Sequence, residues 1–481
     1  MLFNSFVYLV FFTAVVLLFY ILPHKSRWVM LLLASAAFYM AWVPELILLL
    51  LAVAFVNWAC AELISRSGGR RLRKIWLIAD LALSFGALFV FKYLGFIGRS
   101  LAAFFGFFGQ NFPAGHVSLI LPMGISFYTF HSVGYAIDMY RGSYPRERNF
   151  LKFALFVTFF PQLVAGPIGR ADKLLPSLLE RKDFRPENIS AGVKQMLLGY
   201  FKKVLVADRL ALAVNTVYKA PQYHLGLQSV IATVFFAVQI YCDFSGYTDI
   251  AIGCARCMGV DLMKNFNQPY LSGSVREFWR RWHISLSAWF RDYLYIPMGG
   301  SRVSKPRRAF NVMVTFLVSG LWHGADWTFV IWGGLHGLFQ NAETWLEERV
   351  RPWRTRVIRA LRYPLTFAAV CFAWIFFRAD TLSDAFRMIG GLFDGAGRWG
   401  DRQFVYAALT GMGVSLLDLL IDAGLVLLVF GMELIGRDKS VYENMERRGA
   451  LARGAFYFAA AALICCFGVF EHGGMFIYFQ F

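Results

Sequence analysis

The chain contains apolar runs that are too long and too frequent for a water-soluble protein. The first, residues 5–23, reads SFVYLVFFTAVVLLFYILP. A helix needs about 20 mainly apolar residues to cross the ~30 Å hydrocarbon core of a bilayer. Because lipid offers no hydrogen bonds, a backbone inside it must form helices or a closed barrel. Unbroken runs, rather than alternating segments of ~10 residues, favour helices. The sequence therefore predicts an all-α polytopic membrane protein.

Similar runs recur along the chain, in which 58% of residues are hydrophobic and only 16% are charged. Some are too short, too long or too polar for one crossing, so we expect roughly ten to twelve spans with additional re-entrant pieces. The candidate segments are 5–23, 28–43, 44–63, 75–97, 117–139, 151–168, 190–215, 226–253, 307–322, 327–345, 362–377, 405–434 and 453–470.

The positive charges predict the orientation of the spans. The net charge of +18 lies largely in short loops between apolar runs, including 24–27, 65–74, 141–152 and 170–185. Cytoplasmic loops are enriched in Lys and Arg, so these loops are expected inside and the N-terminus outside. The first run lacks a basic leader and a clear cleavage site, so we interpret it as a retained span. We expect contact with membrane lipids and no binding of nucleic acid.

No polar segment is long enough to form a separate soluble domain. We therefore expect one integral-membrane domain over residues 1–481, with N-terminal spans in 1–115, a motif-bearing core in 116–345 and C-terminal spans in 346–481. No internal repeat is visible, which weakens the case for a transporter built from inverted repeats. Cys254 and Cys257 form a lone C-x-x-C, which favours packing over a metal site, and no metal is expected.

His323 is an ionisable residue at the end of an apolar run. Arg308 lies fifteen residues earlier, in a basic segment expected in the cytoplasm. At ~1.5 Å per residue His323 would lie roughly 22 Å along a helix, inside the membrane. A buried imidazole favours its neutral form, which can accept a proton. An intramembrane ionisable group suggests function, and a structural histidine bonded to a neighbouring helix is the alternative.

His336 follows thirteen residues after His323, so the two would not share one face of a continuous helix. A break at residues 324–326 would allow them to approach each other. Asp326 could then cap the following helix or orient an imidazole. Trp322 adjoins His323 and is included in the candidate site.

Residues 272–300 combine tryptophans and arginines at helical spacing. The pattern predicts one amphipathic helix with an apolar face beside a cationic stripe that contains Arg276 and Arg291. The cationic stripe could attract anionic lipid headgroups, or it could bind a phosphate-bearing donor such as coenzyme A. The candidate site residues in this stretch are Trp279, Arg280, Arg281, His283, Asp292 and Tyr293.

A further polar group interrupts the apolar run 238–253. Asp243, Ser245 and Asp249 are costly in lipid unless they are paired, solvated or protonated. They could line a cavity or pair with Arg276 or Arg280. We favour pairing or site architecture over direct catalysis.

The motifs that contain these residues resemble the membrane-bound O-acyltransferase (MBOAT) family, and most closely its bacterial alginate O-acetyltransferase branch. The likeness covers most of the chain. In order, the motifs are LPMGISFYTFHSVGYAIDMYRG, FFPQLVAGPIGR, YCDFSGYTDIAIG, NFNQPY, EFWRRWHISLSAWFRDYLYIPMGG, LVSGLWHGADWTFVIWGGLHG, FAWIFFRA and FIYFQF.

The resemblance implies that His323 is the family's catalytic histidine and that His336 is its second recurring one. It implies an MBOAT-like ring of tilted transmembrane helices, with re-entrant and interfacial helices, around a thinned centre. It also implies a bacterial inner (plasma) membrane location. Because the chain lacks an SGNH-type esterase domain, a separate extracytoplasmic SGNH-type acetyltransferase or polysaccharide export protein is expected as partner.

We therefore predict an O-acetyltransferase for an alginate-like exopolysaccharide. Its acyl donor would be cytoplasmic acetyl-coenzyme A, with no bound cofactor, and His323 would be the general base. D-alanyl transfer and peptidoglycan O-acylation are the alternatives within the family. A proton-coupled transporter that uses Asp243, Asp249 and His323, or a scaffold without activity, are alternatives of other classes.

Overall fold

The computed structural model of the chain describes residues 1, 3–110, 112, 120–224, 226–349, 356–436, 440–470, 476 and 477. The regular structure across these residues is helical, without a strand, which confirms the all-α prediction. The chain divides into two compact units: Met1–Val193 with Ala251–Met263, and Lys194–Ile250 with Lys264–Phe481. The predicted boundaries near residues 115 and 345 separate the motif-bearing core from the flanking spans. They do not describe these compact units, and they stay a prediction.

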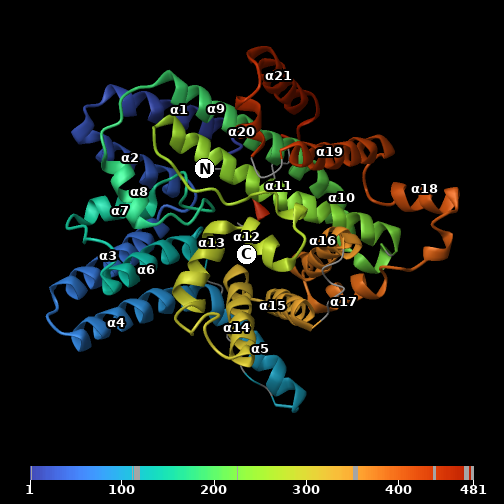
Figure 1. Cartoon of the computed structure of the whole chain (residues 1–481), viewed down its shortest axis with the longest axis horizontal. Helices are drawn as coiled ribbons and strands as arrows, with labels where there is room; N and C mark the ends of the chain where they lie inside the picture. The colour runs from blue at the N-terminus through green and yellow to red at the C-terminus, as the bar shows by residue number, and fades with distance from the viewer. Residues whose placement is uncertain are drawn as a thin grey trace. The chain divides into compact units, whose positions relative to one another are not determined.

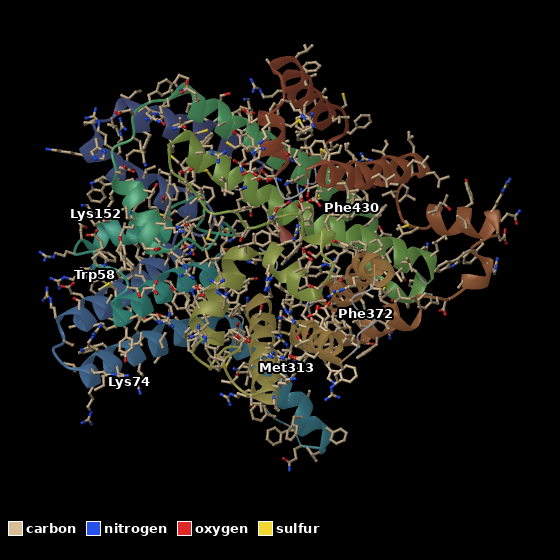
Figure 2. All side chains as sticks on the ribbon, in the orientation of Figure 1. Trp58, Lys74, Lys152, Met313, Phe372 and Phe430 are labelled. Carbon is tan, nitrogen blue, oxygen red and sulfur yellow. The ribbon has the colours of Figure 1, made fainter. Side chains whose placement is uncertain are left out.

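The first unit consists mainly of packed helices. These are α1 (Phe6–Ile21), α2 (His24–Met40), α3 (Leu46–Arg66), α4 (Arg70–Leu88), η1 (Phe89–Tyr93), α5 (Leu94–Phe107), α6 (Ile125–Arg141), α7 (Phe150–Thr158), α8 (Ala171–Leu179) and the start of α9 (Pro186–Tyr200). Helices α3, α4 and α6 lie side by side (Figure 1). Figure 2 labels Trp58 on α3, Lys74 on α4 and Lys152 on α7.

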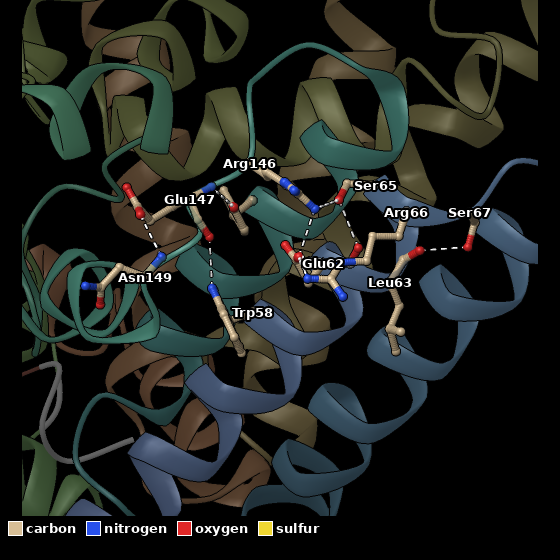
Figure 3. A network of polar contacts seen from close by, with 10 residues as sticks. Trp58, Glu62, Leu63, Ser65, Arg66, Ser67, Arg146, Glu147 and Asn149 are labelled. Atoms are coloured by element: carbon tan, nitrogen blue, oxygen red, sulfur yellow. Dashed lines mark hydrogen bonds and ion pairs between the residues drawn. The ribbon is translucent and has the colours of Figure 1, made fainter.

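Polar contacts attach α3 to the segment between α6 and α7 (Figure 3). The Arg146 guanidinium donates to the Glu62 carboxylate at 2.8 Å and to the Ser65 hydroxyl at 3.1 Å. The Trp58 indole donates to the Glu147 carbonyl at 2.9 Å. Each of these bonds joins α3 to residues just before α7 that are far from it in sequence. Together they hold α3 against the start of α7.

The second unit contains the remaining helices and a core rich in aromatic rings. Its elements are η2 (Phe201–Ala207), α10 (Asp208–Lys219), η3 (Pro221–Tyr223), most of α11 (Leu227–Cys257), η4 (Pro269–Leu271), α12 (Val275–Arg281), α13 (Ile284–Phe290), η5 (Arg291–Tyr295), α14 (Lys305–His323), α15 (Trp327–Arg349), α16 (Arg356–Arg378), α17 (Leu382–Gly390), η7 (Ala396–Arg398), α18 (Arg402–Thr410), α19 (Leu416–Ile435), α20 (Val441–Glu446) and α21 (Ala450–Phe467). Trp282, Trp332 and Trp374 are fully buried in this core.

Among the described residues, five helical segments are long and apolar enough to cross a membrane. They are Leu46–Arg66, Arg70–Phe107, Leu227–Cys257, Ala360–Arg378 and Ala450–Phe467. The predicted ring of ten to twelve spans is not tested by this criterion. Helix α7 has nine residues, or about 14 Å at 1.5 Å per residue, too short to cross ~30 Å of hydrocarbon alone. This length supports the prediction of a re-entrant piece at 151–168.

Two further predicted segments are interrupted or shortened in the structure. The segment 405–434 is interrupted between α18 and α19, where Gly413 has a φ of +76°. The segment 117–139 contains a shorter helix than expected, because α6 begins only at Ile125. Gly124 has a φ of +74° before that helix, and residues 117–119 lie outside the described part of the chain.

Candidate active site

Helices α14 and α15 form a tight hairpin that carries both candidate histidines. A Cβ atom at Gly320 would overlap the Phe329 carbonyl oxygen, and one at Gly333 would overlap the Phe316 carbonyl oxygen. The two backbones can therefore approach only because these positions lack side chains. Earlier on α14, the sulfur of Met313, which Figure 2 labels, lies 3.0 Å from where a Cβ atom at Gly337 would be. The α14–α15 hairpin therefore depends on glycines in both helices.

His323 is the last residue of α14 and is 3% exposed. Helix α15 starts at Trp327, and the predicted break falls between the two helices. The Asp326 carboxylate accepts a hydrogen bond from the Thr328 backbone N–H at 3.0 Å, so it caps α15, as one of its predicted roles required. The aspartate thus stabilises the turn that follows the histidine.

Aromatic rings surround the His323 imidazole. The Trp322 and Trp332 rings have their centroids 4.9 Å from it, and Phe377 lies at 5.6 Å, all with steep interplanar angles. The His283 ring lies at 6.3 Å. These contacts place the imidazole in a surrounding rich in aromatic rings.

His336 lies on α15 and is fully buried. Its Nδ1 accepts a hydrogen bond from the Trp279 indole N–H at 3.2 Å, which places the proton of the neutral ring on Nε2. The Trp332 ring lies 5.1 Å from His336 and 4.9 Å from His323. Trp332 thus contacts both candidate histidines.

The predicted single amphipathic helix over 272–300 is wrong. Helix α12 ends at Arg281, α13 starts at Ile284, and the π-helical segment η5 follows from Arg291. His283, between them, has a φ of +43°, which is unusual for a residue with a side chain. This bend takes His283 off the expected cationic stripe and buries it completely near His323.

Asn265 stabilises the bend from a distant part of the sequence. Its side-chain oxygen accepts bonds from the Ser285 N–H at 3.1 Å and the Ser285 hydroxyl at 2.7 Å, and lies 3.3 Å from His283 Nδ1. Its carbonyl accepts the Ile284 N–H at 2.9 Å. These bonds satisfy the backbone N–H groups of Ile284 and Ser285 at the start of α13. In a continuous helix these groups would bond to carbonyls of the preceding turn. Helical periodicity alone could not reveal this partner.

Sequence reasoning missed three rings of the site: Trp332, Trp374 and Phe377. The Trp332 and Trp374 rings stack with centroids 5.6 Å apart, and Phe377 lies 5.0 Å from Trp332. Trp332 stands four residues before His336, so helical spacing could have identified it. Trp374 and Phe377 belong to the motif FAWIFFRA, which gave no separate indication of contact with the histidines.

A cavity of about 980 Å³ opens beside this cluster within the second unit. Trp279, Phe316 and Ser319 line one part of it, and Ser319 lies one helical turn before His323. The charged side chains that line the cavity comprise five cations and two carboxylates. They are Arg276, Arg280, Arg291, Lys305, Arg308, Glu347 and Glu348. The cavity thus combines a basic lining with a wall adjacent to His336.

Ion pairs organise the basic lining. Lys305 and Arg308 both bind Glu348, at 2.7 and 2.8 Å, and these hydrogen bonds lower the pKa of the Glu348 carboxyl to about 2. The Arg276 guanidinium donates to the Thr344 hydroxyl at 2.7 Å. Arg280 is exposed and forms no ion pair with the described residues, which leaves its guanidinium accessible to an anion.

The other candidates of this stretch lie outside the cavity lining. The Arg281 guanidinium pairs with the Glu277 carboxylate at 2.9 Å, and Asp292 pairs with Arg291 at 2.7 Å. The Tyr293 ring packs against Trp289 at 5.0 Å. These side chains support the surrounding structure, so the cavity involves only part of the predicted set.

Asp243 belongs to a separate buried ion-pair cluster with Lys203 and Asp208. The Lys203 ammonium lies 2.5 Å from Asp243 and 2.9 Å from Asp208, and all three side chains are less than a tenth exposed. Asp243 also accepts the Ile477 backbone N–H at 2.8 Å. The predicted pairing is therefore present, but the partner is Lys203 rather than Arg276 or Arg280.

The neighbouring polar residues follow the same pattern. Asp249 pairs with Lys202 at 2.7 Å. Ser245 is buried on α11, two residues after Asp243. Phe244, between them, has its ring 4.8 Å from His283, so α11 connects the two clusters by packing. The remainder of the terminal motif, residues 478–481, lies outside the described residues.

Cys254 and Cys257 are both buried, as packing residues would be. The Cys257 sulfur lies 3.8 Å from the Ile189 carbonyl oxygen. The described residues contain no group of three or more His, Cys, Asp or Glu side chains that could hold a metal ion.

Comparison with known proteins identifies the family. The model of the membrane-bound O-acyltransferase family matches residues 144–381. The probable alginate O-acetylase of Pseudomonas aeruginosa is 40% identical over 90% of this chain and 82% of its own length. The peptidoglycan O-acetyltransferase of Helicobacter pylori is 34% identical over 75% of this chain and 73% of its own length.

A third relative, the teichoic acid D-alanyltransferase of Bacillus subtilis, is 27% identical over 54% of this chain and 69% of its own length. All three relatives are acyltransferases by name, and the matched region contains both candidate histidines and the cavity. The chain therefore belongs to the membrane-bound O-acyltransferase family and is a membrane O-acyltransferase.

Proposed function

We propose that the protein transfers an acetyl group from cytoplasmic acetyl-coenzyme A to a hydroxyl on the other side of the membrane, for O-acetylation of an alginate-like exopolysaccharide. The observation that carries this proposal is the cavity of about 980 Å³ with a basic lining beside the histidines. The acceptor class rests on relatives that are alginate O-acetylases by name.

The cavity has the chemistry that a coenzyme A thioester requires. Arg280 offers an accessible guanidinium, and guanidinium groups bind phosphate through paired hydrogen bonds. The apolar wall of Trp279 and Phe316 suits the uncharged acyl end. With phosphates at the basic lining, the thioester would reach toward Ser319, one turn from His323.

The reaction needs a base for the acceptor hydroxyl. His323 takes the hydroxyl proton as the oxygen attacks the thioester carbonyl carbon. The carbon–sulfur bond breaks, an ester forms, and the thiolate receives the proton from the imidazolium. The surrounding rings of Trp322, Trp332 and Phe377 keep bulk water from the thioester.

His336 has a second role in this proposal. Because its Nδ1 accepts the Trp279 N–H, its Nε2–H is a donor, and Nε2 bonds to no residue that the structure describes. A preorganised donor can stabilise the oxyanion that forms on the thioester carbonyl. In this proposal the Nε2–H of His336 therefore stabilises the oxyanion.

The protein that accepts the acetyl group is proposed from the resemblance to the family. A separate extracytoplasmic SGNH-type acetyltransferase or polysaccharide export protein would receive the acetyl group or present the polysaccharide. The orientation in the inner membrane, with the N-terminus outside, is proposed from the basic segments. Peptidoglycan acetylation and D-alanyl transfer would use the same histidine with a different acceptor or donor.

Two observations weigh against the transporter alternative. Asp243 and Asp249, which a proton relay would need, are bound to Lys203 and Lys202. The relatives are acyltransferases by name. In liposomes, flux of a substrate without acyl turnover would support transport instead.

The acetyl ester content of exported polysaccharide tests the proposal directly. Cells would carry the wild type, His323→Ala or, as a control, His24→Ala, whose side chain is exposed at the start of α2. We expect His323→Ala to lower ester content by ~10²-fold or more, the usual effect of removing a general base. Membrane abundance must be equal among the variants. Unchanged ester content in a folded His323→Ala protein would refute the base assignment.

Binding of the acyl donor at the cavity is tested with purified protein and radiolabelled acetyl-coenzyme A. Arg280→Ala should raise the KM for the donor, because a phosphate loses its guanidinium partner. A matched control is Arg281→Ala, which removes a guanidinium bound to Glu277 outside the cavity lining. Equal effects of both substitutions would argue against donor binding at this cavity.

A further inference from the structure

The first unit contains a buried polar site on α3 and α4 that is separate from the acyltransfer site. Asp80 is fully buried on α4, ten residues after Arg70. At ~1.5 Å per residue this is roughly 15 Å along the helix, near the middle of a ~30 Å hydrocarbon core. A carboxyl group at such depth is costly unless something compensates its charge.

Contacts between helices define what faces Asp80. The Asn57 amide nitrogen donates to the Ser84 hydroxyl at 2.8 Å and to the Val53 carbonyl at 2.8 Å. Ser84 stands one turn after Asp80 on α4, and Cys60 stands nearly one turn after Asn57 on antiparallel α3. Asp80 and Cys60 are close enough to interact electrostatically. Asn57, Ser84 and Asp80 therefore share the α3–α4 interface.

Three side-chain oxygens at this interface have no hydrogen-bond donor among the described residues. Both Asp80 carboxyl oxygens and the Asn57 side-chain oxygen are buried and accept no hydrogen bond from any described residue. The orientation of the Asn57 amide is fixed, because its nitrogen already donates two bonds. An ionised carboxylate and an amide oxygen can only accept, so neither can satisfy the other.

Among the described residues, the cations nearest to Asp80 along α4 and η1 bond to other groups. Arg73, seven residues before Asp80, donates to the Tyr140 carbonyl of α6 at 2.7 Å. Lys92, twelve residues after it, donates to the Ser126 hydroxyl at 3.5 Å. The ring contact of Phe85 with Phe130 places Asp80 opposite the later part of α6.

The ionisable groups in this part of the helices are few. On α6 they are His131, whose Nε2 accepts the Gly169 N–H at 3.0 Å, Tyr135, whose hydroxyl accepts the Glu147 N–H at 2.9 Å, and Asp138. On α3 they are Cys60 and Glu62, and Glu62 is paired with Arg146 at 2.8 Å. None of them is a cation bound to Asp80.

We propose that Asp80, Asn57 and Ser84 form an intramembrane site for a small monovalent cation, either Na⁺ or a proton. One carboxylate balances one positive charge, and neutral oxygens complete the ligand set that a hard cation prefers. Divalent ions require more carboxylates than this interface offers. The site is distinct from the acyltransfer site, whose residues all belong to the other unit.

Carbodiimide labelling tests the site in membranes that contain the full chain. Dicyclohexylcarbodiimide enters lipid and reacts with protonated carboxyl groups, and mass spectrometry would locate the adduct. We expect an adduct at Asp80 at neutral pH. Protection by NaCl but not by choline chloride identifies Na⁺ as the ligand that competes with the proton. Labelling that is indifferent to Na⁺ identifies the proton alone, and both results support the site.

A variant provides a second readout. Asp80→Asn keeps the size of the side chain and removes its negative charge, so it should fold to wild-type abundance. Its Tm should lose the part of the Na⁺ and pH dependence that Asp80 causes, whereas the part caused by other titrating groups such as Glu348 should remain. The matched control is Asp183→Asn, which removes an exposed carboxylate paired with Arg181 at 3.2 Å and should leave the Asp80 adduct unchanged.

Two results would overturn the proposal. One is the absence of an Asp80 adduct across mildly acidic to mildly alkaline pH, with and without Na⁺, which would indicate an ionised carboxylate solvated by water. The other is a wild-type Tm that responds to Na⁺ and pH in the same way as that of Asp80→Asn. If Asp80→Asn does not fold, wild-type labelling decides the question.

Discussion

The second unit buries polar side chains in two different ways. The histidine cluster (His283, His323 and His336) is surrounded by aromatic rings, with Trp332 in contact with two of its members. The ion-pair cluster (Lys203, Asp208 and Asp243) contains charges that compensate one another within 3 Å. A neutral imidazole needs no counter-charge. Separation of the Lys203 ammonium from the Asp208 and Asp243 carboxylates would instead leave uncompensated buried charges, at a high cost in free energy.

This difference distinguishes residues that can take part in the reaction from residues that stabilise the fold. A neutral imidazole remains able to accept a proton from a substrate. A buried carboxylate held by an ammonium group is committed to its partner, and removal of either one leaves an uncompensated charge. Variants of the histidine cluster should therefore change rate, and variants of the ion-pair cluster should change stability.

Lys203→Met should have the largest effect on folding. It leaves two carboxylates in the core without their cation, which typically costs about 3–5 kcal/mol. Thermal unfolding in detergent measures the loss. The comparison is Lys202→Met, whose pair with Asp249 is about a fifth exposed and should therefore cost less than the loss of Lys203. Equal losses from both variants would contradict the distinction between the fully buried pair and the partly exposed pair.

Gly333→Ala should have the next largest effect. Its Cβ would overlap the Phe316 carbonyl oxygen, so the α14–α15 hairpin must open, at a cost of about 1–3 kcal/mol. The adjacent Gly334→Ala is a matched control, because its Cβ would meet only Leu317 at an ordinary 3.5 Å. The measurement is Tm together with turnover per folded molecule. A hairpin that tolerates both substitutions equally would not depend on close backbone packing.

Trp279→Phe should change rate more than stability. It keeps an aromatic ring but removes the N–H that His336 Nδ1 accepts, and loss of such a bond is worth about 0.5–1.5 kcal/mol, or up to about tenfold in rate. Steady-state acetyl transfer and its pH profile provide the test. Trp289→Phe, in a ring that packs on Tyr293, should leave the rate unchanged. A similar rate loss in both would indicate a packing effect only.

Glu348 should produce the smallest effect. Its bonds to Lys305 and Arg308 lower the folded-state pKa to about 2, below the ordinary value of ~4.3. The stabilisation is therefore complete above the unfolded pKa and is lost as pH falls toward the folded pKa. Comparison of Tm for wild type and Glu348→Gln on acidification measures it. A difference that grows with rising pH above neutrality would have the wrong sign.

Much of the fold could be predicted because it depends on local pattern. Apolar runs predicted the helices, and basic Arg308 followed by an apolar segment placed His323 at the end of α14. The break before Trp327 and the cap by Asp326 follow from residues within one turn. Local rules suffice wherever the partner of a group lies a few residues away.

The candidate site was predicted only in part. His323, His336, Trp279 and Arg280 lie in or beside the cavity region, whereas Arg281, Asp292 and Tyr293 lie outside its lining. Trp374 and Phe377 come from α16, and nothing in their spacing indicates contact with α14 and α15.

The sequence by itself determined a helical membrane protein with an ionisable histidine at the end of an apolar helix, because lipid requires helices and helices impose periodicity. Only the tertiary structure decided that His283 bends inward, because Asn265 satisfies the start of α13 from another segment. Only it decided that Asp243 binds Lys203, because an ion pair between residues forty positions apart depends on how α11 packs against η2.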